Sequence, residues 1–105
     1  MTDARLEAAG IELVALAPER AEFRLPGRWQ GRPVRWRVTL EALDHPSRRQ
    51  PAVPQYIELV PAGGEEVLVR VGLRIVRVDV PAVLKTGIML RNYRRLRPGR
   101  HEWTP

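Results

Sequence analysis

Few residues in this chain of 105 could carry out catalytic chemistry. Asp44, His45 and Ser47 bring a carboxylate, an imidazole and a hydroxyl close together in the sequence. Members of a catalytic triad converge in the folded protein and rarely lie side by side in the chain, so this group is more typical of a polar, proline-rich loop. His101 and Glu102 lack the spacing of a metal site. No glycine motif for phosphate binding is present. We therefore expect no catalysis, no cofactor and no metal.

The second feature is an arginine-rich segment near the C-terminus. The net charge is +6, and all but one of the 18 basic residues are arginines. Residues 91–105 carry five arginines against one glutamate. Arginines interleaved with aromatic rings can combine phosphate contacts with base stacking, which makes this segment a candidate nucleic-acid contact. Its candidate binding residues are Arg91, Tyr93, Arg94, Arg95, Arg97 and Arg100, with Trp103 beyond them.

The same arginines have a simpler explanation. A GC-rich genome encodes arginine in preference to lysine without any ligand being involved. In that case Tyr93 and Leu96 pack on the rest of the protein, and the arginines are solvated. The sequence leaves both alternatives open.

A further candidate contact is Trp29, which lies between Arg28 and Arg32. Proline and glycine occur at both ends of the segment 26–33, so we expect it to form a loop. A tryptophan in such a loop either folds back into the core or, if it is exposed, anchors a partner.

These residues must be positioned by a sheet, and the stretch 66–80 predicts its central strand. Val67, Val69 and Val71 fall on one face of an extended chain, and Arg70 falls on the other. The apolar phase shifts near residue 75, which indicates a bulge or a strand end there. Outward arginines on this and other strands can pair with glutamates across the sheet, giving a solvated, charge-paired face. The expected arginines are 24, 35, 37, 70 and 74, and the expected glutamates are 22, 58 and 66.

The remaining elements follow from local patterns. We expect strands at 11–16, 22–25, 34–40 and 55–60, with Gly63 and Gly64 in a hairpin turn. A helix capped by Thr2 should come before these strands, and one helical turn at 41–43 should follow the strand at 34–40. A second helix starts near Pro81, where Asp79 is a candidate cap. The apolar faces on the two sides of Gly87 do not match, so we expect this helix to end there and a short amphipathic segment to follow at 88–96.

Together these patterns predict a single α+β domain covering residues 1–105. A mainly antiparallel sheet of about five or six strands carries a short C-terminal helical segment on one face, and residues 98–105 form a flexible tail. No cysteine, leader or membrane span is evident, so we expect a cytoplasmic protein with no membrane partner.

Three functions remain open from the sequence. We expect a non-catalytic protein-binding or adaptor module, which recognises a protein partner or itself through a sheet edge or the Trp29 loop. The alternative is a nucleic-acid-binding accessory protein that uses the arginine-rich segment. An enzyme or ligand-binding domain around Asp44, His45 and Ser47 is the third.

Overall fold

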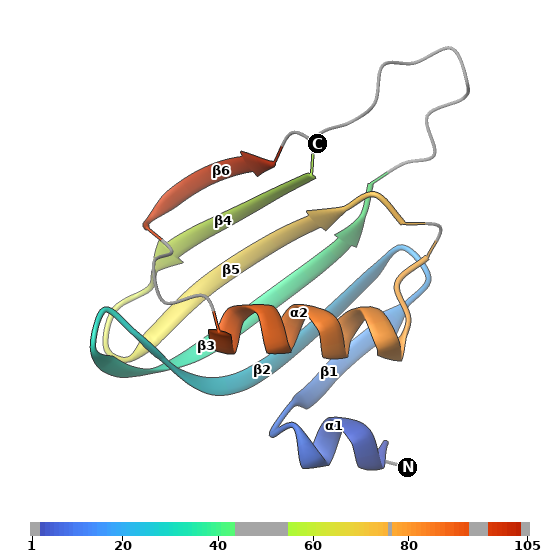
Figure 1. The fold of residues 1–105 in the computed structure, drawn as a ribbon, viewed down its shortest axis with the longest axis horizontal. Coiled ribbons are helices and arrows are strands. Elements are labelled where there is room, and N and C mark those ends of the chain that lie inside the picture. The colour runs from blue at the N-terminus through green and yellow to red at the C-terminus, as the bar shows by residue number, and fades with distance from the viewer. Residues whose placement is uncertain (1–2, 44–54, 76, 93–96, 104–105) are drawn as a thin grey trace.

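The computed structural model describes residues 3–43, 55–75, 77–92 and 97–103. They form one mixed sheet of six strands, with a long helix packed against one face (Figure 1). This confirms the expected α+β fold with a mainly antiparallel sheet. The elements in chain order are α1 (Ala4–Ala8), β1 (Glu12–Ala17), β2 (Arg20–Trp29), β3 (Arg32–Ala42), β4 (Gln55–Pro61), β5 (Glu66–Leu73), α2 (Val80–Asn92) and β6 (Gly99–Trp103).

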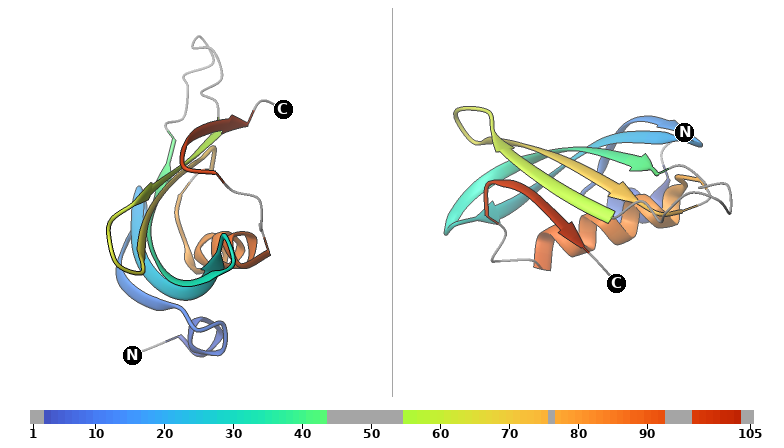
Figure 2. Two further views of the ribbon diagram at one scale, coloured as in Figure 1. Left: turned by 90° about the vertical axis from the view of Figure 1, so that its left-hand side faces the viewer. Right: turned by 90° about the horizontal axis from the view of Figure 1, so that it is seen from above.

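The strands lie side by side in the order β1-β2-β3-β5-β4-β6. All neighbouring pairs are antiparallel except β3 and β5, which run parallel. The β4–β5 hairpin turns through Gly63 and Gly64, whose φ angles are +86° and +60°. Because β5 rather than β4 docks on β3, the hairpin leaves β4 available for another strand. The sheet curves around α2 (Figure 2).

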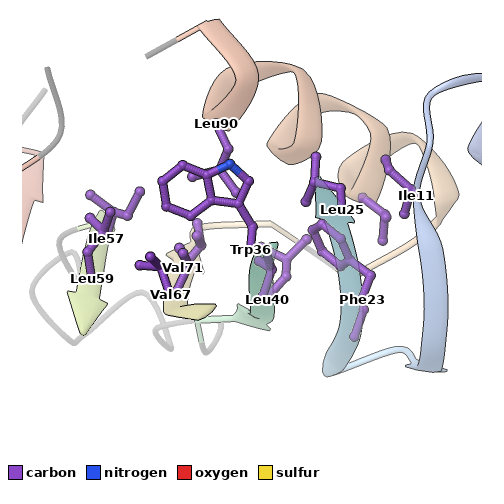
Figure 3. Close-up of a cluster of buried hydrophobic side chains, with 14 of the residues drawn as sticks. Ile11, Phe23, Leu25, Trp36, Leu40, Ile57, Leu59, Val67, Val71 and Leu90 are labelled. Carbon is purple, nitrogen blue, oxygen red and sulfur yellow. The ribbon is translucent and has the colours of Figure 1, made fainter. Parts of the chain in front are cut away.

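Strand β5 is central, as its alternation predicts. Val67, Val69 and Val71 are at most 2% exposed, whereas Leu68 and Arg70 lie on the opposite, outer face. The strand ends at Leu73, and the described residues between it and α2 form no second strand. The shift in apolar phase therefore marks the end of a strand. Figure 3 shows the core side chains from several strands gathered beneath Leu90 of α2.

The segment 26–33 is not a loop, contrary to the expectation from its prolines and glycines. Strand β2 pairs with β3 as far as Trp29, and only Gln30 and Gly31 make the turn, with φ angles of +53° and +76°. Gly27 serves another purpose, because a Cβ there would lie 2.2 Å from Nε1 of Trp36. Gly27 is thus a residue of strand β2 that lets the Trp36 ring pack directly on the strand's backbone.

The single helical turn expected at 41–43 is also absent. Strand β3 continues through Ala42, which lies in register with Leu73 of β5. The backbone N–H of Leu43 then donates to the carbonyl oxygen of Leu73 at 2.8 Å. Pairing with β5 thus outweighs the local preference for a cap and a helical turn.

Helix α2 is continuous through Gly87, so the predicted break at this residue is wrong. Its buried residues are Val83, Thr86, Gly87 and Leu90, which share one helical face, whereas Ile88 is 53% exposed. A Cβ on Gly87 would lie 2.8 Å from Cδ1 of Ile11. The glycine is thus a contact point of the helix. The expected cap is confirmed, because the carboxylate of Asp79 accepts a hydrogen bond from the backbone N–H of Ala82 at 3.0 Å.

Both ends of the chain differ from expectation. Asp3 rather than Thr2 caps α1, and its side chain accepts from the backbone N–H of Arg5 at 2.8 Å. Residues 99–103 do not form a tail but pair with β4 as the edge strand β6. Gly99, with a φ angle of +101°, begins this strand. The free edge of β4 offers backbone hydrogen bonds that a tail would leave to solvent.

Candidate binding surfaces

Trp29 lies in the core. It is 3% exposed, and its ring meets that of Trp36 edge to face, with centroids 6.2 Å apart and an interplanar angle of 64°. This geometry is favourable for an aromatic pair. Of the two alternatives for Trp29, the structure supports the core residue, because so little of its surface can reach a partner.

The described part of the arginine-rich segment is largely engaged within the protein. Arg91 donates from its guanidinium to the carbonyl oxygen of Ala9, which ties the end of α2 to the end of α1. Arg97 is exposed, and its carbonyl oxygen lies 2.8 Å from Nε2 of His101. Tyr93, Arg94 and Arg95 lie outside the described residues, as do Asp44, His45 and Ser47.

Arg100 belongs to a cluster on the outer face of the sheet. Its guanidinium carbon lies 4.1 Å from the centroid of the Tyr56 ring, a cation–π contact. The Tyr56 hydroxyl donates to the carboxylate of Glu41 at 3.0 Å, and the ring crosses over Gly72. Burial of the ring raises the pKa of Tyr56 above its usual 10.0, and the hydrogen bond to Glu41 raises it further. The cluster links four strands, which indicates a structural role.

Of the five arginines expected to pair with glutamates across the sheet, Arg37 and Arg70 do so within the described part of the chain. Arg37 lies 3.4 Å from Glu66, and Arg70 lies 3.7 Å from Glu41 and 3.8 Å from Glu58. The expected partner for Glu22 is an arginine across the sheet, but the observed one is Arg20 on the same strand, at 2.9 Å. These side chains are between 30% and 56% exposed, so each pair contributes only about 0–1 kcal/mol to stability.

A hollow of about 310 Å³ opens on the outer face of the sheet. Its apolar lining is unusually accessible, since Val14, Val60 and Leu68 are 51%, 46% and 37% exposed. Its polar lining includes the side chains of Arg24 and Arg37. A solvated charged face alone does not account for three exposed aliphatic side chains in one hollow.

The free edge of the sheet beside this hollow is strand β1, whose one partner among the described strands is β2. Its sequence, Glu-Leu-Val-Ala-Leu-Ala, contains one charge, at Glu12. Val14 and Leu16 are 51% and 43% exposed. No backbone hydrogen bond of residues 12–17 other than those to β2 occurs within the described part of the chain. The sequence predicts this strand, but it predicts neither its place at the edge of the sheet nor the exposure of its apolar residues.

Neither a metal centre nor a membrane-spanning element appears in the part of the chain that the structure describes. No three His, Cys, Asp or Glu side chains there are grouped so as to hold a metal ion. None of its helices is both long enough and apolar enough to span a membrane. No protein-family model matches this chain, and no curated protein or solved structure is significantly similar to it.

Proposed function

We propose that this protein is a non-catalytic protein-binding module that accepts a strand from another polypeptide along the free edge of β1. The observation that carries the proposal is the low charge and the apolar exposure of that edge. Natural sheets usually guard an edge strand with lysine, proline, inward charges, a β-bulge or a covering element. The pairing of β1 with β2 shifts register at a bulge between Leu13 and Ala15, but the strand carries little charge. Strand β1 spans Glu12–Ala17, has five uncharged residues of six and exposes two large aliphatic side chains.

The opposite edge of the sheet supports this by contrast. Strand β6 carries Arg100 and Glu102 within five residues, so it has charges that discourage edge pairing. An added strand at β1 would gain backbone hydrogen bonds along its length and bury Val14 and Leu16. Strand addition of this kind needs no catalytic group, no cofactor and no preformed deep pocket.

The nucleic-acid alternative has less support from the described residues. Arg91 and Arg100 contact Ala9, Tyr56 and Glu102 within the protein. Recruiting either arginine to phosphate would cost an existing contact. A basic protein of this size adheres to any polyanion at low salt, so weak retention on nucleic acid does not distinguish the two functions.

The proposal is tested by selecting binders from a library of short random peptides. We expect extended, apolar peptides to be enriched, and their binding to weaken at least about tenfold in Leu16→Lys, because lysine introduces the charge that natural edge strands use against pairing. Ile88→Lys on α2 is the matched control, since it places the same charge on another exposed aliphatic residue. Thermal unfolding establishes that both variants fold.

The proposal fails if no peptide is enriched, or if enriched peptides bind Leu16→Lys and wild-type protein equally. Sub-micromolar binding to single-stranded DNA or RNA that weakens steeply with salt would favour the nucleic-acid alternative instead.

A further inference from the structure

Arg24 and Arg37 form an unusual pair on the outer face of the sheet. They lie directly opposite one another in the register of β2 and β3, and both line the hollow. Like charges in directly opposed positions destabilise a sheet. An arrangement that costs stability in the free protein is reasonable where a ligand of opposite charge relieves it.

The neighbouring carboxylates do not neutralise Arg24. Glu66 pairs with Arg37, and Glu22 pairs with Arg20. Glu12 lies in register with Arg24 on β1, yet within the described ranges Arg24 has no ion pair. The hollow is lined by Arg24, Arg37 and Arg70 and by one glutamate, Glu22. Arg37, Arg70 and Glu22 already have ion-pair partners, which leaves Arg24 as the charge in the hollow without one among the described residues.

The rest of the lining shows what kind of ligand suits the charge. The hydroxyl group of Thr39 can donate or accept a hydrogen bond, and Val14, Val60 and Leu68 present aliphatic surface. A simple inorganic anion would leave these aliphatic side chains in water. A carboxylate on an apolar chain suits both the arginines and the aliphatic side chains of the hollow. The guanidinium groups match the carboxylate in charge and in hydrogen-bond geometry, and the apolar chain covers the aliphatic surface.

The hollow is also continuous with the edge of β1, since Val14 belongs to both. Neighbouring strands lie about 4.8 Å apart, so a strand added to β1 would lie about two strand spacings from the backbone of β2. The long side chain of Arg24 can cover much of that distance across Val14. An acidic side chain on the outer face of the added strand can then meet the guanidinium over the hollow.

We infer that the partner strand is acidic as well as apolar, and that one of its Asp or Glu side chains binds Arg24 on the β1 side of the hollow. This inference rests on the proposed function and specifies its partner: an extended apolar segment with a carboxylate that faces the outer side of the sheet. Arg24 then selects, among the strands that can add to β1, those that carry such a carboxylate.

The test uses two fluorescein-labelled peptides of alternating Val and Thr, one with a central Glu and the other with Gln in its place. We expect wild-type protein to bind the Glu peptide about tenfold more tightly, the typical benefit of one charge-assisted hydrogen-bonded pair. In Arg24→Gln the preference should disappear. Arg32→Gln is the control, because it removes the same charge from an exposed arginine in the β2–β3 turn region, outside the hollow.

Each outcome bears on the inference. Loss of the Glu preference in Arg24→Gln, with its retention in Arg32→Gln, supports the site. If both peptides bind equally well and Leu16→Lys weakens both, strand addition stands and the acidic specificity is wrong. If Arg24→Gln and Arg32→Gln reduce the preference alike, only general electrostatics is at work and the site is overturned. Failure of both peptides to bind, while library-selected peptides still bind at β1, also overturns it. If an oligonucleotide displaces the Glu peptide and the displacement depends on Arg24, the ligand of this site is a nucleic-acid phosphate and not a carboxylate.

Discussion

Gly72→Ala should be strongly destabilising, although alanine is the smallest possible addition. A Cβ at this position would lie 2.2 Å from Cε1 and 2.7 Å from Cδ1 of Tyr56, and 2.9 Å from Cδ2 of Leu43. The end of the leucine side chain can move aside. The tyrosine ring cannot do so easily, because Arg100 packs over it and Glu41 accepts its hydroxyl hydrogen.

The size of the effect follows from what Tyr56 loses when its ring is displaced. Exposure of this side chain, now 6% exposed, costs about 1.5–3 kcal/mol. The hydrogen bond to Glu41 adds about 0.5–1.5 kcal/mol. Replacing glycine in a strand returns about 0.5–1 kcal/mol. The net loss is therefore about 1–4 kcal/mol, and each kcal/mol corresponds to a fall in Tm of about 4–8 °C in a domain of this size.

Urea unfolding of Gly72→Ala, Tyr56→Ala and the double variant measures this loss. If the ring contact is the cause, the double variant should be no less stable than Tyr56→Ala alone, since the clash is gone when the ring is gone. A Gly72→Ala protein within about 0.5 kcal/mol of wild type, or a double variant in which the two losses simply add, would refute this account of the cluster.

Three further predictions concern the core, the helix and pH. Val69→Ala should lower the free energy of unfolding by about 1–3 kcal/mol and Arg70→Ala by much less, because only the valine is buried. If urea unfolding gives the reverse order, the two faces of the strand are misassigned. Gly87→Ala should change the free energy of unfolding by no more than about 1 kcal/mol, because the end of the Ile11 side chain can move aside and the remaining strain offsets the gain in helix propensity. A loss of more than about 2 kcal/mol in urea unfolding would show that Ile11 is held rigidly. The raised pKa of Tyr56 contributes stability that is present below pH 10.0 and is lost as the pH rises through the pKa of the folded state. The Tm of wild-type protein should therefore fall more steeply above pH 10.0 than the Tm of Tyr56→Phe. An identical fall in both proteins would contradict this.

Alternation of side chains was enough to predict the central part of the fold. Strands β3 and β5 bury every second residue, and their sequences show this directly. Two of the predictions that fail rest on a glycine as a local signal. Gly27 and Gly87 instead lie where another element approaches closely, at Trp36 and Ile11. Local propensity contains no information about what lies across the core, so these positions suggested a loop and a helix end.

The candidate site was less predictable, because it depends on pairing between distant strands. Strand β1 is at an edge only because β5 docks on β3 and the β4–β5 hairpin extends the sheet on the far side. The opposition of Arg24 and Arg37 depends on the register set by the turn at Gln30 and Gly31. The low charge of residues 12–17 by itself favours a covered strand over an edge strand, because edge strands ordinarily carry charges.

Hydrogen exchange of the protein with and without a library-selected peptide tests the central claim most directly. Strand addition at β1 requires that amides of Glu12–Ala17 with no partner in the free protein become hydrogen-bonded to the peptide, so their exchange should slow markedly when it binds. The amides of β6, at the opposite edge, should exchange as before. New protection confined to β6, or to the residues around Arg97 and Arg100, with none in β1, would contradict the account.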